Sequence, residues 1–177
     1  NPTRIGFIKI LKKMNANIRI KNLKKKSGEH VGNIFVKSGS LKPINCPKKL
    51  VSSAIDEFPL LFIIASVIKG VCKFSGINEL RHKESDRIKN IEIGLNQIGI
   101  KTQSTIDSLK IFGNPNIKIE KTLEVYPKKD HRIAVSYVIL GLLLEGRIKI
   151  HNCETINTSF PSFLKLIRKV GGKFEVK

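Results

Sequence analysis

The stretch that decides the fold is residues 83–102, KESDRIKNIEIGLNQIGIKT, because it contains a whole helix with its start and its stop. Four apolar residues recur at helical spacing and predict one buried face: Ile88, Ile91, Leu95 and Ile98. Ser85 or Asp86 suits the N-cap position, and Gly99 suits the C-terminal stop. Apolar and polar residues alternate after Gly99, so the stretch predicts a helix followed by a strand.

The same plan occurs at both ends of the chain. Residues 1–20, NPTRIGFIKILKKMNANIRI, have a Pro-containing start, a helical apolar pattern and then an alternating segment. The apolar positions of that helical pattern are Phe7, Ile8, Leu11 and Met14. Residues 158–176, TSFPSFLKLIRKVGGKFEV, repeat the plan with paired glycines before an expected strand. The three segments therefore form a loose internal repeat.

A second kind of unit precedes two of these segments. Residues 54–80 and 128–156 each contain an acid, an apolar helix, a glycine and a short strand, and the strands are expected at 71–74 and 147–150. The two helices have almost no polar face, which predicts burial on all sides. Their apolar runs are too short to span a bilayer, which takes about 20 residues.

Two hairpins are expected in the rest of the chain. Residues 17–22 are predicted to pair with 33–37, and residues 109–112 with 117–120. The alternation of strands and helices favours an α/β fold. No linker long enough to divide the chain is visible, and 177 residues are enough for one well-buried core. We therefore expect one α/β unit over residues 1–177.

Charge points to anionic partners without choosing among them. The chain has 33 Lys and Arg against 14 Asp and Glu, which gives a net charge of +19. Such a charge attracts nucleic acid, anionic membranes and small phosphorylated molecules. The lysines lie at surface-type positions without interleaved aromatic residues that could stack on bases. This pattern favours a solvated basic surface.

Cysteine and histidine usage indicates neither disulfides nor a metal centre. Cys46, Cys72 and Cys153 are odd in number and far apart, which fits a reducing, cytoplasmic compartment. The four histidines form no HExxH or similar pattern, so no metal is indicated. No signal peptide is visible, and the chain begins with Asn, which suggests a piece of a longer protein.

Two helix starts carry an arginine where a cation is unfavourable. Arg87 directly follows the expected N-cap, and Arg132 follows Asp130 by two residues. The helix dipole disfavours a cation there by about 0.3–1 kcal/mol. An arginine fork beside free backbone N–H groups binds phosphate or carboxylate well. We therefore expect an anion site where these helix starts meet, with Arg4 as a third candidate.

The same residues also have structural interpretations. Arg87 and Arg132 would form structural ion networks with neighbouring acids, namely Glu84, Asp86 and Asp130. His131 would be an ordinary histidine near a helix cap, and Asp56 would be an N-cap. The repeated arginine favours the anion site, because a packed repeat brings equivalent helix ends to one face.

These motifs resemble the C-terminal part of the enolpyruvylshikimate phosphate synthase family. The resemblance is carried by NPTRIG (1–6), IDEFPLLFIIA (55–65), ELRHKESDRI (79–88), DHRIAVSYVILGLLLEG (130–146) and TSFPSFLKLI (158–167). The motifs follow the family's order over nearly the whole chain, and KESDR with DHR is highly specific. The resemblance implies an inside-out α/β barrel of repeated βαβαββ units. Residues 1–177 would supply most of its C-terminal domain, and the N-terminal domain is absent.

Enzymes of this family transfer the enolpyruvyl group of phosphoenolpyruvate to the 5-hydroxyl of shikimate 3-phosphate and release phosphate. Both substrates are anionic, and the resemblance implies neither a cofactor nor a metal. Motif matching implies that Arg87 and Arg132 bind phosphoenolpyruvate. It also implies that Lys83 and Asp56 contact shikimate 3-phosphate.

The resemblance also implies which residues move protons. Asp56 would accept the proton of the attacking hydroxyl, which requires a carboxylate within hydrogen-bond reach. Glu84 would protonate the methylene carbon of phosphoenolpyruvate, with His131 close by. Lys83 and Arg87 favour the ionised form of Glu84, so protonation would rely on the negative charge of bound phosphoenolpyruvate.

Two positions depart from the family pattern, and two other functions remain as alternatives. Thr158 stands where many members have a lysine that contacts phosphoenolpyruvate, and His82 where a small apolar residue is usual. The alternatives are the related transferase that acts on a UDP-sugar and a basic nucleic-acid-binding module. We expect the chain alone to be inactive, and the complete protein to be a monomer that binds neither nucleic acid nor membrane.

Overall fold

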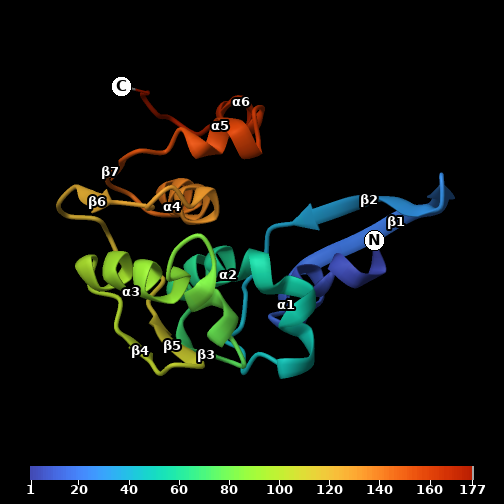
Figure 1. Ribbon diagram of the computed structural model, residues 1–177, viewed down its shortest axis with the longest axis horizontal. Helices are drawn as coiled ribbons and strands as arrows, with labels where there is room; N and C mark the ends of the chain where they lie inside the picture. The colour runs from blue at the N-terminus through green and yellow to red at the C-terminus, as the bar shows by residue number, and fades with distance from the viewer. Residues whose placement is uncertain (177) are drawn as a thin grey trace.

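The computed structural model describes residues 1–176, and its helices and sheets are stacked in layers (Figure 1). The α-helices are α1 (Gly6–Lys13), α2 (Phe58–Ser66), α3 (Arg87–Gln97), α4 (His131–Leu143), α5 (Thr155–Ser159) and α6 (Phe163–Lys169). The strands are β1 (Asn17–Lys26), β2 (Glu29–Lys37), β3 (Gly70–Ser75), β4 (Thr102–Ser104), β5 (Ser108–Gly113), β6 (Leu123–Val125) and β7 (Ile148–Ile150). Short 3₁₀ helices are η1 (Pro2–Arg4), η2 (Lys48–Leu50), η3 (Ser52–Glu57) and η4 (Asn78–His82). In Figure 1 the β3-β5-β4 sheet lies lowest, followed upward by α2 with α3, then α4, then α5 with α6.

One complete βαβαββ unit occupies residues 44–113. Asn45 pairs in parallel with Lys73 of β3, and the Cys46 N–H donates to the Lys73 carbonyl at 2.8 Å. Strand β3 pairs with β5 antiparallel, from Gly70 opposite Gly113 onward, and β4 pairs with the other edge of β5. The order along the chain is therefore a short strand-like segment, α2, β3, α3, β4 and β5.

Parts of the same unit flank this complete copy. The segment α1-β1-β2 has the order of α3-β4-β5, and its two strands form the predicted hairpin, with Asn17 opposite Lys37. The segment β6-α4-β7 is a parallel strand–helix–strand unit, which α5 and α6 follow. The predicted internal repeat is confirmed for the helix and the following strand of residues 1–20 and 83–104, whereas residues 158–176 form helices without the expected strand.

One predicted strand pairing and one further predicted strand are wrong. Residues 117–120 form no strand with β5, because β3 and β4 already occupy both edges of β5. The Ile119 N–H instead donates to the Glu145 carbonyl at 3.1 Å. Residues 171–176, which are expected to form a strand after α6, form none.

Helix α3 begins and ends as the sequence predicts. The Asp86 carboxylate is the N-cap and accepts a hydrogen bond from the Lys89 N–H at 2.9 Å. Gly99 has a φ of +82°, and the Ile100 N–H donates to the Leu95 carbonyl at 3.0 Å. This left-handed glycine ends the helix and turns the chain into β4.

Helix α2 lies in the interior, as predicted, whereas α4 lies there only up to Leu140, and its last three residues, Gly141–Leu143, are exposed. Phe58 and Phe62 of α2 pack edge-to-face with each other and with Phe74 of β3, with ring centroids 5.1–5.9 Å apart. Helix α4 contacts the main core on one side and, on the other, a smaller apolar cluster of α5 and α6. Within residues 1–176, no helix combines the length and the hydropathy that a membrane span requires. The layer formed by α2, α3 and α4 therefore fixes where their first residues lie.

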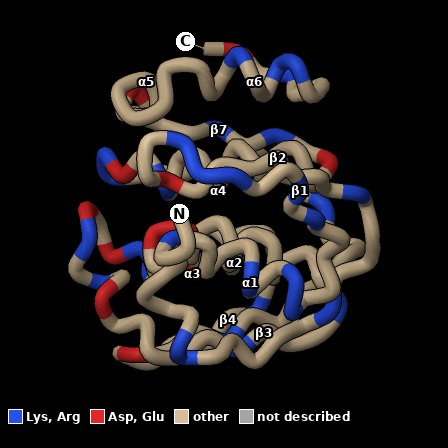
Figure 2. The backbone as a smooth tube through the Cα atoms, turned by 90° about the vertical axis from the view of Figure 1, so that its right-hand side faces the viewer, with Lys and Arg blue, Asp and Glu red and all other residues tan. Residues whose placement is uncertain are grey.

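The β1–β2 hairpin projects away from this body (Figure 1). All of β2 and nearly all of β1 are exposed, including apolar side chains such as Leu23, Phe35 and Val36. In Figure 2, Lys and Arg residues occur from the lower layers to α6 at the top. The positive charge is therefore spread over the fold.

Gly113, the last residue of β5, allows a close approach to the end of α2. A Cβ at Gly113 would lie 2.2 Å from the carbonyl oxygens of Ala65 and Ile68. We expect Gly113→Ala to destabilise the complete protein by about 1–3 kcal/mol, because rigid backbone must move. Urea denaturation measures this, with Gly39→Ala as the control, since Gly39 has no neighbouring atom within 4 Å of its Cβ position. Equal effects of the two variants would contradict the prediction.

Candidate active site

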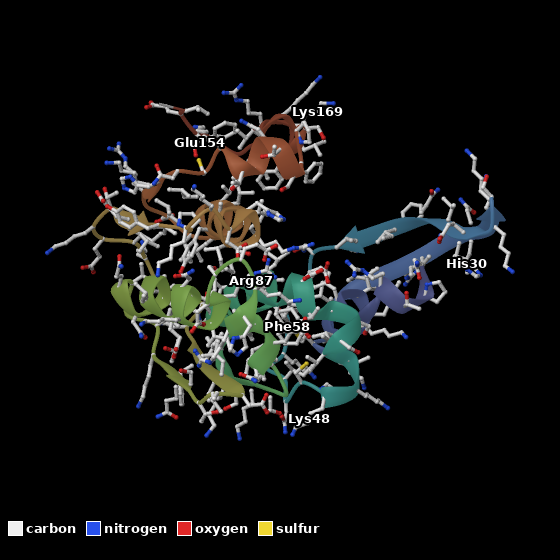
Figure 3. The ribbon with its side chains drawn as sticks, in the orientation of Figure 1. His30, Lys48, Phe58, Arg87, Glu154 and Lys169 are labelled. Carbon is white, nitrogen blue, oxygen red and sulfur yellow. The ribbon has the colours of Figure 1, made fainter. Side chains whose placement is uncertain are left out.

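The starts of α2, α3 and α4 meet in one place, and charged side chains fill the space between them. Arg87 is the first residue of α3, and in Figure 3 it lies between α4 and the layer of α2 and α3. Arg132 lies in the first turn of α4, and Asp56 lies just before α2. The Tyr137 hydroxyl of α4 donates to the Asn90 carbonyl of α3 at 3.0 Å, which fixes these two helices against each other.

Arg87 is almost completely buried, with only 1% of its side chain exposed. Its Nε donates to the Asp130 carboxylate at 2.8 Å, and its Nη2 donates to Glu84 at 2.6 Å. Its Nη1 has no hydrogen-bond partner within residues 1–176 and lies 3.5 Å from the Asp56 carboxylate. One nitrogen of this fork is therefore buried without a hydrogen bond, and its nearest charged partner is the Asp56 carboxylate.

Arg132 approaches Asp56 from the other helix start. Its Nη1 donates to the Asp56 carbonyl at 3.1 Å, and its Nη2 lies 3.6 Å from the Asp56 carboxylate. The same Nη1 lies 3.6 Å from the Glu57 carboxylate. About a third of the Arg132 side chain is exposed, so its guanidinium remains accessible to a ligand.

Asp56 is surrounded by cations, and it does not cap a helix. Glu57 occupies the N-cap position of α2, without a capping hydrogen bond from its side chain, so the N-cap interpretation of Asp56 is wrong. Partial burial favours the protonated form of Asp56, but four nearby cations outweigh it and hold the pKa of Asp56 below its ordinary value. The four cations are Arg132, Lys83, Arg87 and Arg4.

The loop before α3 presents Lys83 and Glu84 at the same place. Lys83 forms a salt bridge with Glu79 and is close enough to Asp56 to lower its pKa. The Glu84 side chain is about half exposed while it contacts Arg87. His82 is exposed, so the departure from the family pattern at this position is accommodated on the surface.

Sequence reasoning did not identify Arg81 as a support for this loop. Its Nη1 donates to the Asp86 carboxylate at 2.9 Å, and its Nε donates to the Ile106 carbonyl at 3.1 Å. Within ELRHKESDRI, Lys83 pairs with Glu79 and Glu84 pairs with Arg87. Arg81 and Asp86 are the remaining pair of opposite charges, and their side chains meet across the start of α3. Arg81 thereby ties the start of α3 to the segment around Ile106.

The ion-network interpretation of the arginines is realised in part. Arg87 pairs with Glu84 and Asp130, as that interpretation predicts, whereas Asp86 pairs with Arg81 instead. Because Arg87 keeps Nη1 without a hydrogen bond, the ion network does not exclude an anion site.

The predicted site residue His131 lies outside the network, and so does Thr158, the position that departs from the family pattern. His131 begins α4 between Asp130 and Arg132, is half-buried, and makes no hydrogen bond or salt bridge within the described residues. Thr158 is exposed in α5, and its hydroxyl donates to the Thr155 carbonyl of the same helix at 3.3 Å. In residues 1–176 no group of His, Cys, Asp and Glu has a metal-binding arrangement. The site therefore consists of clustered cations around Asp56, with Glu57, Glu84 and Asp130 paired to the same arginines, an arrangement that suits small anions and proton transfer.

Comparisons with known proteins all identify the same family. The family model described as EPSP synthase (3-phosphoshikimate 1-carboxyvinyltransferase) matches residues 1–167. The 3-phosphoshikimate 1-carboxyvinyltransferase of Halorhodospira halophila is 39% identical over 176 residues, which cover 99% of this chain and 39% of the relative. The enzyme of the same name from Ruthia magnifica is 42% identical and covers 97% of this chain and 39% of the relative. The chain thus spans about two fifths of the length of the curated relatives it matches.

Solved structures agree with the sequence comparisons. The EPSP synthase of Acinetobacter baumannii superposes with a TM-score of 0.93 at 41% identity and covers all of this chain and 41% of that structure. The enolpyruvyl transferase NikO of Streptomyces tendae gives a TM-score of 0.63 at 16% identity, covering 96% of this chain and 36% of that structure. The second similarity concerns the fold alone. The predicted α/β fold with repeated βαβαββ units is therefore confirmed as the fold of enolpyruvyl transferases.

Proposed function

The chain belongs to the EPSP synthase family, and we propose that it forms one wall of the active site of a complete 3-phosphoshikimate 1-carboxyvinyltransferase. The reaction is transfer of the enolpyruvyl group of phosphoenolpyruvate to the 5-hydroxyl of shikimate 3-phosphate, with release of phosphate. The observation that carries the proposal is the meeting of Arg87, Arg132 and Lys83 around Asp56 at three adjoining helix starts. Two anionic substrates need such a set of cations.

The two arginines bind phosphoenolpyruvate. Arg87 offers its free Nη1 from a fixed, buried position, and Arg132 offers a partly exposed guanidinium from the neighbouring helix. Together they match an anion with a carboxylate and a phosphate, since guanidinium groups bind both in a bidentate manner. Lys83 contacts shikimate 3-phosphate from the loop before α3.

Asp56 and Glu84 carry the proton transfers. Asp56 takes the proton of the 5-hydroxyl as the hydroxyl oxygen attacks C2 of phosphoenolpyruvate, while C3 gains a proton from Glu84, with His131 adjacent. The resulting tetrahedral intermediate loses phosphate, and C3 returns its proton, which restores the double bond in the product. The lowered pKa of Asp56 keeps it ionised before the substrates bind, as a proton acceptor requires.

The rest of the active site comes from outside residues 1–177. We propose that these residues form most of the C-terminal domain and that an N-terminal domain supplies the facing wall, because the matched relatives are about two and a half times as long. The exposed apolar side chains of the β1–β2 hairpin provide a surface for additional chain. The complete protein is proposed to act as a monomer. Three free cysteines support a reducing compartment, which we take to be the cytoplasm.

The two alternatives are not favoured. A UDP-sugar acceptor is disfavoured because the two curated relatives compared above are both named 3-phosphoshikimate 1-carboxyvinyltransferase. A nucleic-acid-binding module is disfavoured because Lys and Arg are spread over the fold instead of lining one face (Figure 2).

We expect the complete protein to release inorganic phosphate only when both substrates are present. The 177-residue chain alone should release none, because one wall of the cleft cannot hold both substrates. A phosphate-release assay measures this, with a UDP-sugar in place of shikimate 3-phosphate as the control acceptor. The proposed function would be overturned if phosphoenolpyruvate released phosphate only with the UDP-sugar as acceptor. It would also be overturned if no phosphate were released with shikimate 3-phosphate as acceptor.

A further inference from the structure

Asp130 is a completely buried carboxylate that none of the proposed chemical steps uses. It is the N-cap of α4, where its Oδ1 accepts the backbone N–H of Arg132 at 3.0 Å and that of Ile133 at 3.4 Å. Its Oδ2 accepts Nε of Arg87, from the start of the neighbouring helix α3, at 2.8 Å. One carboxylate therefore joins both helix starts that carry the substrate-binding arginines.

A short hydrogen-bond chain fixes the orientation of Asp130. The Asn90 side-chain amide donates to the Ser85 hydroxyl oxygen at 2.8 Å, and the Ser85 hydroxyl is 3.0 Å from Oδ2 of Asp130. Because Asn90 uses an acceptor lone pair of Ser85, the single proton of Ser85 points to Asp130. Both carboxylate oxygens of Asp130 are thereby occupied by donors.

We infer that Asp130 is a positioning residue, whose negative charge holds the Arg87 guanidinium so that Nη1 is left to bind the anionic substrate. The inference rests on the proposed function and adds a residue that does not touch the substrate. A buried arginine needs a buried counter-charge. Asp130 supplies that charge at Nε, on the side of the guanidinium away from Nη1. Nη2 donates to Glu84 at 2.6 Å and to Oδ1 of Asp130 at 3.4 Å, so Nη1, 3.5 Å from the Asp56 carboxylate, is the only nitrogen of the guanidinium without a hydrogen bond among the described residues.

Helix capping alone is the competing explanation, and the two roles can be separated by substitution. An asparagine is as good an N-cap as an aspartate, since its Oδ1 accepts the same backbone N–H groups. In Asp130→Asn, however, the side-chain amide would face Nε of Arg87, donor against donor. The variant therefore retains the cap and loses the hold on Arg87.

The test uses the complete protein with Asp130→Asn, Ser85→Ala and, as control, Asp107→Asn. Asp107 also accepts two backbone N–H groups, those of Gly76 and Asn78 at 3.1 Å, but contacts no arginine side chain. We expect Asp130→Asn to raise the Kd of phosphoenolpyruvate, measured with shikimate 3-phosphate bound, by about 10- to 100-fold. Ser85→Ala should raise it by about 2- to 10-fold. The Kd of shikimate 3-phosphate and the behaviour of Asp107→Asn should stay near wild type.

A second readout does not depend on substrates. The Nε–H resonance of Arg87, assigned by its absence in Arg87→Lys, should exchange slowly with solvent in the wild type and much faster in Asp130→Asn. Failure of the wild type to turn over would remove the proposed function, and this resonance would still report on Asp130. The inference is overturned if Asp130→Asn binds phosphoenolpyruvate as the wild type does. It is equally overturned if Asp130→Asn lowers the affinity for both substrates to the same extent and lowers the Tm as well. The same holds if the exchange rate of the Arg87 Nε–H in Asp130→Asn equals that of the wild type. Should Asp130→Asn fail to fold, an unchanged Kd of phosphoenolpyruvate in Ser85→Ala would overturn it.

Discussion

Replacing Asp56 by Asn in the complete protein is expected to lower kcat by about 10²- to 10⁴-fold, the usual contribution of a positioned general base. Asparagine has nearly the same shape and cannot accept a proton from the 5-hydroxyl. The four surrounding cations stay in place, so both substrates should still bind. Single-turnover measurement of phosphate release at saturating substrates separates this loss in rate from any loss in affinity.

Glu57→Gln is the matched control for that variant. Glu57 is the adjacent carboxylate and lies 3.6 Å from the same Arg132 guanidinium, but it has no part in the proposed proton transfers. We expect Glu57→Gln to retain kcat within about an order of magnitude, since a partly exposed pair at 3.6 Å contributes little. Full activity of Asp56→Asn, or equal losses in the two variants, would remove Asp56 from its role.

The second large effect is expected from Arg87→Ala, in both binding and stability. The substitution removes the free Nη1 donor and leaves the fully buried Asp130 without its counter-charge. Breaking a buried ion pair in this way costs about 3–5 kcal/mol of the free energy of unfolding. Urea denaturation measures that loss, and calorimetry with shikimate 3-phosphate present measures the expected loss of phosphoenolpyruvate affinity.

Arg132→Ala separates the two consequences. Its guanidinium is about a third exposed and pairs with the partly exposed Asp56, so we expect a similar loss of phosphoenolpyruvate affinity with a much smaller loss of stability. Arg87→Lys keeps the charge and loses the fork, so affinity should fall while part of the stability is retained. If either alanine variant lowered the affinity for shikimate 3-phosphate instead of that for phosphoenolpyruvate, the two substrates would be assigned to the wrong residues.

Local patterns were enough to predict the helices and the meeting of their starts. Helix α3 begins at the Asp86 cap and ends before Gly99, and both signals act within one turn of the helix. These signals and the apolar face that begins with Ile88 can therefore be identified from spacing in the sequence. The repeated arginine after each helix start, at Arg87 and Arg132, indicated a shared anion site because equivalent ends of a repeat face one side.

Pairings between distant segments were harder to predict. The alternation in residues 117–120 is compatible with a strand, and only the tertiary structure shows that β3 and β4 leave β5 no free edge. The dual role of Asp130, as a cap for α4 and as counter-charge for Arg87, is likewise invisible to spacing, since 43 residues separate the two partners. The same holds for Asp56, whose sequence context before Pro59 suggests a cap, while its contacts are with cations from other elements.

The most direct test is a crystal structure of the complete protein with shikimate 3-phosphate and phosphoenolpyruvate bound. The account predicts an oxygen of phosphoenolpyruvate within about 2.7–3.2 Å of Nη1 of Arg87, with a second one in reach of the Arg132 guanidinium. It also predicts the 5-hydroxyl in contact with the Asp56 carboxylate. A structure in which phosphoenolpyruvate binds elsewhere, while Nη1 of Arg87 stays without a partner, would contradict the account.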